Sequence, residues 1–332
     1  MKNKKIWLAL LISFVVLIAV GVSTYYFLNQ NKEAEAVEEQ KEEKKTVEVK
    51  PLLYKVTKND SENVMYLFGS IHVADDQAYP MKKEVMEAYD ASDFLAVEFD
   101  VVAYQANLKA QAEDLKYLMC DSGKTLKDYL SEKTYDKVIK YLKDNNMYNS
   151  LYENYKPVLI YSLVTNVANT KSGLDSNKGI DLHFLNKAHN EKKEILEVES
   201  SSFQYQLLSG FSNEFYDYLI SNTITFEPVM VANVKALYEA WLRGDADKLG
   251  STYDSDPIEE EQEPNSLLDE YALYNDRLIN KRNKSMFETV ENYFKDNKKV
   301  FVVVGAGHII GKSGIAESFK NAGYNVELIK YK

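Results

Sequence analysis

Two short segments of the sequence place a histidine just after an apolar run. Both have the pattern Gly-x-x-His, with Gly69 and His72 after "YLF" and Gly305 and His308 after "FVVV". Glycine at a strand end lets the backbone turn sharply, and α/β folds commonly bind ligands at strand ends. Because the chain has only four histidines, two in this setting predict that both rings serve one site.

A glutamate completes this candidate site. In "FLAVEFD", Glu98 ends an apolar strand, where an ionised carboxylate is costly to bury unless it is paired or bound to a metal. Two imidazoles and a carboxylate are a familiar ligand set for a divalent ion that activates water. The alternatives are hydrogen-bonded structural histidines and a Glu98 that is solvated or forms a salt bridge.

Other polar residues extend the candidate site. Glu199, in "LEVESSSFQ", follows another apolar strand and is expected to orient a ligand or substrate, or to pair with a helix N-terminus. Arg282 is the basic residue suited to stabilising a developing oxyanion, with a surface ion pair as the alternative. Asp181 is expected to cap a helix, on which His183 either packs or supports the site. His189 is expected to be exposed.

These residues require strands that end close together. Apolar runs predict six strands, at residues 52–58, 63–70, 93–100, 193–200, 299–305 and 324–330. The first two are expected to form a hairpin. Segments 125–146 and 285–297 have the three-and-four spacing of amphipathic helices. We therefore predict an α/β fold, a mixed central sheet with a large inserted helical lobe, over residues 51–332.

The first 50 residues differ from this domain. Residues 1–30 contain a charge-free apolar run long enough to cross a bilayer as a helix, after lysines that should stay cytoplasmic. A cleaved signal peptide is the alternative. Residues 31–50 form a charged linker with almost no large apolar side chain. We therefore predict a single-pass protein of the cell membrane, with the domain at 51–332 extracytoplasmic.

Composition excludes other classes of protein. The chain has 51 acidic and 40 basic residues, a net charge of -11, and no conspicuous Lys/Arg cluster in the domain, so no nucleic-acid partner is expected. A single cysteine, Cys120, excludes an internal disulfide framework and a Cys-rich zinc site. Any metal must therefore be held by histidines and carboxylates.

Several segments, in order, resemble the TraB/GumN family from about residue 52 to 330. They include "YLFGSIHVADDQAYPM", "GIDLHFLNKAH", "ILEVESSSFQ" and "VFVVVGAGHIIGKSGIAESFKNAGYNVELI". This family is related to TIKI-type metalloproteases, for which two Gly-x-x-His motifs and a glutamate are proposed to form a divalent-metal site on an α/β core. The resemblance implies that His72, Glu98 and His308 hold the ion, with Mn, Co or Zn as candidates. TraB-type members are associated with shutting down peptide pheromones, which implies a peptide or protein substrate.

The sequence thus predicts a membrane-anchored, extracytoplasmic, metal-dependent hydrolase that acts on peptides. Glu98, Glu199 and Arg282 are its catalytic candidates. If Glu98 is the general base, the metal needs another ligand. Two alternatives stay open: a non-catalytic surface protein that sequesters a peptide or ligand, and a metal-independent, esterase-like hydrolase with a histidine base.

Overall fold

The computed structural model describes residues 48–253, 257–258 and 264–332. The predicted membrane anchor and nearly all of the charged linker lie outside these ranges. Within them, no helix combines the length and the apolar character that crossing a bilayer requires.

A six-stranded mixed sheet forms the core, in the order β4-β3-β5-β2-β1-β6. Its strands are β1 (Leu53–Lys58), β2 (Ser61–Ser70), β3 (Phe94–Val97), β4 (Glu194–Glu197), β5 (Val300–Gly305) and β6 (Asn325–Leu328). Strands β2 to β5 are parallel, whereas β1 runs antiparallel to both β2 and β6. The six predicted strands and the hairpin are confirmed, although β3 and β4 are shorter than their apolar runs.

The centre of the sheet is the all-buried strand β5. Its run of apolar residues is typical of a parallel strand covered on both faces. Helices α8 (Ile180–Glu191) and α14 (Arg282–Lys295) both contact it. The ring of Phe184 on α8 lies 5.1 Å from that of Phe301 and 5.6 Å from that of Phe68. This close packing holds α8 against β5 and β2.

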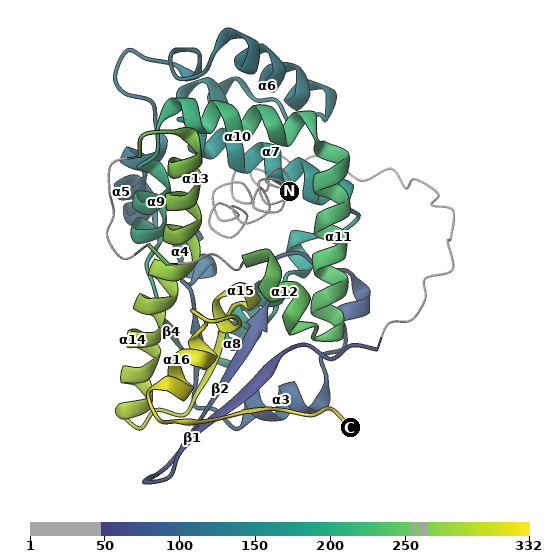
Figure 1. The fold of residues 1–332 in the computed structure, drawn as a ribbon, viewed down its shortest axis with the longest axis vertical. Coiled ribbons are helices and arrows are strands. Elements are labelled where there is room, and N and C mark those ends of the chain that lie inside the picture. Colours follow the sequence, from purple (N-terminus) through teal and green to yellow (C-terminus); the bar gives the residue numbers. More distant parts are fainter. Residues whose placement is uncertain (1–47, 254–256, 259–263) are drawn as a thin grey trace.

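The remaining helices include the predicted inserted lobe, which has a hydrophobic core of its own. In Figure 1 the lobe lies on the side toward which β2 points. Its helices are α4 (Val101–Ala106), α5 (Leu108–Leu118), α6 (Glu132–Asp144), α7 (Pro157–Lys171), α9 (Ser201–Ser209), α10 (Asn213–Thr225), α11 (Glu227–Arg243) and α13 (Leu267–Asp276). The shorter helices α3 (Lys83–Asp90), α12 (Ala246–Tyr253), α15 (Ala306–Ile309) and α16 (Ile315–Asn321) lie nearer the sheet.

Local signals account for several helix ends. Ser131 caps α6, because its side-chain oxygen accepts the N–H of Thr134. Helix α11 ends at Gly244, which has a φ of 62°, in the left-handed region that favours glycine. A Cβ there would lie 2.1 Å from the carbonyl oxygen of Lys50, so the glycine also lets the start of the domain pack against this helix end.

Candidate active site

The four parallel strands bring the predicted site residues to one edge of the sheet. His72 follows β2, Glu98 follows β3 and Glu199 follows β4. His308 lies on α15, directly after β5. Because the carboxyl ends of neighbouring parallel strands meet at one edge, residues far apart in the sequence become neighbours.

Arg282 joins two of these strand ends. Its Nη2 donates to Glu98 Oε2 at 2.6 Å and to Glu199 Oε2 at 2.8 Å, and its Nε donates to Glu199 Oε1 at 3.1 Å. The side chain is only 1% exposed, so the alternative of a surface ion pair is wrong. Although burial opposes the charged form, the two carboxylates outweigh it and raise the pKa of Arg282. The guanidinium is therefore a fixed positive charge.

A π-helical turn, Arg277–Lys281, directly precedes Arg282 and α14. Such turns insert an extra residue into a helix and are frequent at functional sites. The next residue, Asn283, is also buried, and its Oδ1 accepts a hydrogen bond from His308 Nδ1 at 2.6 Å. Two consecutive residues of one helix thus contact Glu98 and His308.

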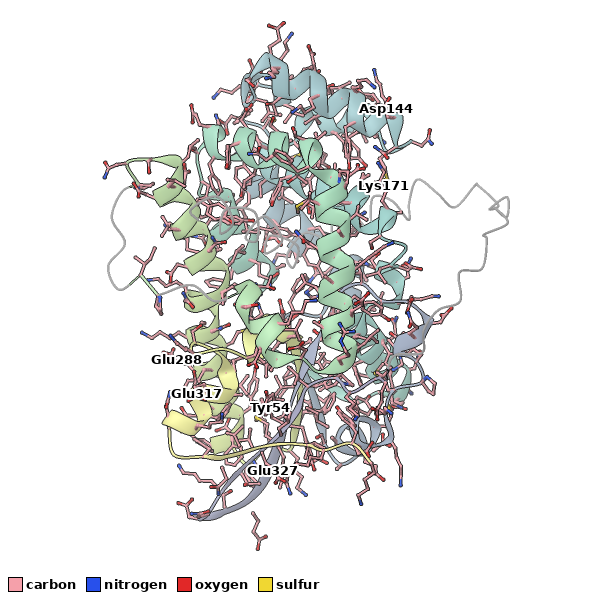
Figure 2. All side chains as sticks on the ribbon, turned by 45° about the vertical axis from the view of Figure 1, so that its right-hand side comes forward. Tyr54, Asp144, Lys171, Glu288, Glu317 and Glu327 are labelled. Carbon is pink, nitrogen blue, oxygen red and sulfur yellow. The ribbon has the colours of Figure 1, made fainter. Side chains whose placement is uncertain are left out.

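The carboxylate of Glu98 lies between Arg282 and the two histidines. Its Oε1 accepts the Gly305 N–H at 3.0 Å and lies 3.9 Å from His308 Nε2. Burial raises the pKa of Glu98, but Arg282, the histidines and this N–H together lower it to about 2. Glu98 is therefore an anion. Figure 2 shows surface carboxylates such as Glu288 on the outside of the molecule, in contrast to this buried one.

His72 has a carboxylate partner that we did not predict. Its Nδ1 lies 2.7 Å from Asp181 Oδ2, and Ser70 Oγ donates to the other oxygen of Asp181. Burial lowers the pKa of His72, but Asp181 offsets this effect and the net pKa is raised. Asp181 lies in the first turn of α8 as expected, yet its contacts are with the last residue of β2 and with the turn that follows.

A glycine allows α8 to begin against the His72 turn. A Cβ on Gly179 would lie 2.4 Å from the carbonyl oxygen of His72, a distance that backbone atoms do not tolerate. The N–H of Ile180 also donates to the carbonyl of Ile71 at 2.9 Å. The segment "GID" at 179–181 was the available sequence signal, because it places this glycine two residues before Asp181.

The pKa of His308 is shifted in the opposite direction from that of His72. The Nδ1 of His308 faces the amide oxygen of Asn283, which can only accept, so the ring proton lies on Nδ1. Burial first, and then the charge of Arg282, lower the pKa of His308 to about 3. The ring is therefore neutral, with an unprotonated Nε2.

The three predicted ligands surround a point above Gly305. A Cβ on this glycine would lie 3.4 Å from Glu98 Oε1, 3.8 Å from His72 Nε2 and 3.6 Å from His308 Cδ2. Both Nε2 atoms are buried without a hydrogen-bond partner among the described residues. Because an unpaired buried polar atom is costly, the two nitrogens indicate the place of a ligand, an ion or water.

The donor types at this point suit a divalent transition metal. Imidazoles held through Nδ1 and a nearby carboxylate are usual in such centres. However, within the ranges that the structure describes, no group of three or more His, Cys, Asp or Glu side chains is arranged to hold a metal ion. Glu98 is engaged by Arg282 and by the Gly305 N–H instead. The donors therefore fit an ion only if Glu98 is shared with Arg282.

Glu199 and an unpredicted glutamine complete the cluster. Gln204, on α9, donates from Nε2 to Glu199 Oε2 at 3.0 Å and to Glu98 Oε2 at 3.3 Å. Ser200, and not Glu199, caps α9 through its side chain. Glu199 thus holds Arg282 in place instead of pairing with the helix N-terminus. The only sequence signal for Gln204 was its place on the helix that follows Glu199.

The other two histidines have different partners. The ring of His183 lies 5.0 Å from that of Tyr79 and also contacts Phe184, so it packs instead of supporting the site. His189 is exposed as expected, with 36% of its side chain accessible, but its Nε2 lies 2.8 Å from Asp100 Oδ2. Of the four histidines, only His72 and His308 therefore contact the cluster.

These features define an α/β protein with a buried, charged cluster at the carboxyl ends of four parallel strands. Residues 52–328 match the model of the TraB/PrgY/gumN family, and the chain belongs to this family. The resemblance drawn from the sequence is thus confirmed. No curated protein and no solved structure shows a significant match to the chain.

Proposed function

We propose that this protein is a metal-dependent hydrolase that cleaves peptides outside the cytoplasm and is anchored to the cell membrane by its N-terminal segment. One observation carries the proposal: the Nε2 atoms of His72 and His308 are buried without partners beside Glu98. The link between this family and TIKI-type metalloproteases also supports it.

The formal charge of the cluster supports a divalent cation. Glu98, Glu199 and Asp181 contribute three negative charges, and Arg282 contributes one positive charge. Uncompensated buried charge is costly, and a divalent ion would balance the remaining two negative charges. Without the ion, His72 can offset one of them in its protonated form, which its raised pKa favours. Metal binding should therefore release a proton.

Each residue of the cluster has a role in this proposal. His72 Nε2, His308 Nε2 and Glu98 Oε1 would hold the ion, which supplies an activated water and polarises a carbonyl when bound. Arg282 Nη1, which lacks a partner among the described residues, stabilises negative charge that develops on the substrate oxygen. Glu199 orients Arg282 through its carboxylate.

The test is metal content and cleavage by the purified full chain. We expect about one divalent ion per chain by elemental analysis, and cleavage of a peptide library that stops with chelator and resumes with Mn, Co or Zn. His72→Ala and His308→Ala should lose both metal and cleavage, whereas the control His189→Ala should keep both. Peptide binding without turnover would instead indicate a protein that sequesters its ligand.

A metal-free hydrolase is the second candidate. It is favoured by the contact between His72 and Asp181, which orients the ring so that Nε2 can act as a general base once the ring has lost its proton, while Glu98 is already paired with Arg282. Cleavage that resists chelator but is lost in Asp181→Asn would support this candidate over the metal-dependent one.

A further inference from the structure

Two atoms beside the proposed metal position have no hydrogen-bond partner in the described part of the chain. One is the acceptor Gln204 Oε1 and the other is the donor Arg282 Nη1. Both side chains are 1% exposed. Because a buried donor or acceptor that lacks a partner costs free energy, each atom indicates a polar ligand group.

The two unpaired atoms belong to neighbouring groups. Gln204 Nε2 and Arg282 Nη2 donate to the same oxygen of Glu199, at 3.0 Å and 2.8 Å. They also share Glu98 Oε2, at 3.3 Å and 2.6 Å. This sharing determines the orientation of the glutamine amide, because the reverse orientation would set its oxygen against two carboxylates. The free acceptor and the free donor therefore belong to two side chains that meet at the same carboxylate oxygens.

We propose that Gln204 and Arg282 bind the backbone of one residue of an extended peptide. Gln204 Oε1 accepts the N–H of that residue, and Arg282 Nη1 donates to its carbonyl oxygen. In an extended chain the N–H and C=O of one residue point to the same side, as they do in antiparallel pairing. The proposal rests on the proposed function, in which Arg282 faces the reacting carbonyl, so the bound residue is the one that carries this carbonyl.

This arrangement makes the site selective for amides over esters. An ester at the position of the bound N–H would leave Gln204 Oε1 buried and unpaired. Sites built to hydrogen-bond an N–H discriminate strongly against analogues that lack it. Gln204 is thus assigned as a specificity-determining residue that contacts the substrate.

Equilibrium dialysis of the full chain, with chelator to stop the proposed cleavage, against a mixture of short N-acetylated peptides tests this role. Each peptide is compared with versions in which one backbone amide at a time is an ester, and binding is measured by mass spectrometry. We expect one position at which the ester weakens binding roughly tenfold. In Gln204→Met this difference should disappear. Gln206→Met, at an exposed position of the same helix, is the control and should retain it.

Three outcomes would overturn the inference: no peptide binding, equal binding of all esters by the unaltered protein, or an ester effect that persists in Gln204→Met. If the variant does not fold, the ester scan of the unaltered protein still shows whether one backbone N–H is bound. Metal-dependent cleavage without amide preference would leave the hydrolase intact and remove the role of Gln204. Amide-selective binding without cleavage would leave the role of Gln204 intact and remove the hydrolase.

Discussion

The His72 turn and the His308 turn both place an imidazole Nε2 near the point above Gly305, but the partners of their Nδ1 atoms differ. His72 lies against the carboxylate of Asp181, and its pKa is raised. His308 lies against the amide of Asn283, and its pKa is lowered to about 3. The turn thus determines where each ring lies, whereas a helix from elsewhere in the chain determines whether the ring carries a charge.

This difference has a consequence for metal binding. His308 is neutral at any pH at which the protein is expected to work, so its Nε2 is always available as a donor. His72 must lose a proton before it can bind a cation. The affinity for a metal should therefore depend on pH through His72 and not through His308.

The largest effect is expected from removing the guanidinium that lies between Glu98 and Glu199. Arg282→Ala leaves Glu98 and Glu199 buried without their cation, which should reduce the free energy of unfolding by about 3–5 kcal/mol. Urea denaturation measures the loss. Arg243→Ala removes an exposed pair with Glu239 and should cost under about 1 kcal/mol. Equal losses in the two variants would contradict the buried pairing.

The protonation difference predicts a second, smaller effect in metal-free protein. The pKa of His308 is about 3 when folded and near 6.5 when unfolded, so the unfolded chain binds more protons between these values. Stability should therefore fall as the pH decreases below 6.5, by at most about 1.4 kcal/mol per pH unit. His72 has a raised pKa and is protonated in both states below pH 6.5, so its contribution is constant there.

His308→Gln tests this sign directly. Down to about pH 5, above the usual pKa of the carboxylates, the unfolding free energy of the variant should fall less steeply than that of the unaltered protein. Urea titrations at several pH values measure the unfolding free energy of both proteins. Chelator should be present throughout. Parallel slopes would show that His308 does not stay neutral in the folded protein.

Exchanging the partner types should weaken metal binding. Asp181→Asn gives His72 an amide partner like that of His308, and we expect a 10–100-fold lower metal affinity, as is usual for loss of such an outer contact. Competition with a chromogenic chelator measures it. Asn186→Asp, at an exposed position of α8, is the control and should leave the affinity unchanged. An unchanged affinity in Asp181→Asn would argue against His72 as a ligand.

The smallest effect is expected at a histidine outside both turns. His189→Gln removes a partly exposed contact with Asp100, which should cost under about 1 kcal/mol of unfolding free energy. Metal content, measured by elemental analysis, should not change. A loss of metal in this variant would show that the site extends beyond the two turns.

The strands and the edge at which they end were predictable because both depend on local patterns. Each apolar run became a strand, because the apolar side chains of a segment such as 299–305 are stabilised by burial away from water. The two Gly-x-x-His turns follow from the same patterns. The membrane anchor at residues 1–30 stays a prediction, because it lies outside the described residues.

The partners within the site were not predictable in the same way. Asp181 and Gln204 lie on helices whose apolar faces explain them as ordinary helical residues, and nothing local shows which carboxylate or imidazole each one meets. The burial of Arg282 was unexpected for the same reason. A charged side chain can be buried only where opposite charges are already assembled, which depends on the whole fold.

The sequence by itself determined the family, the six strands in chain order, and the strand ends at which two histidines and two glutamates lie. These follow from hydrophobic periodicity and glycine placement, which act over a few residues. Only the tertiary structure decided that Asp181 faces His72, that Asn283 faces His308, and that Arg282 is buried between carboxylates. Those pairings join segments distant in the chain, and their energies depend on burial and charge that exist only after folding.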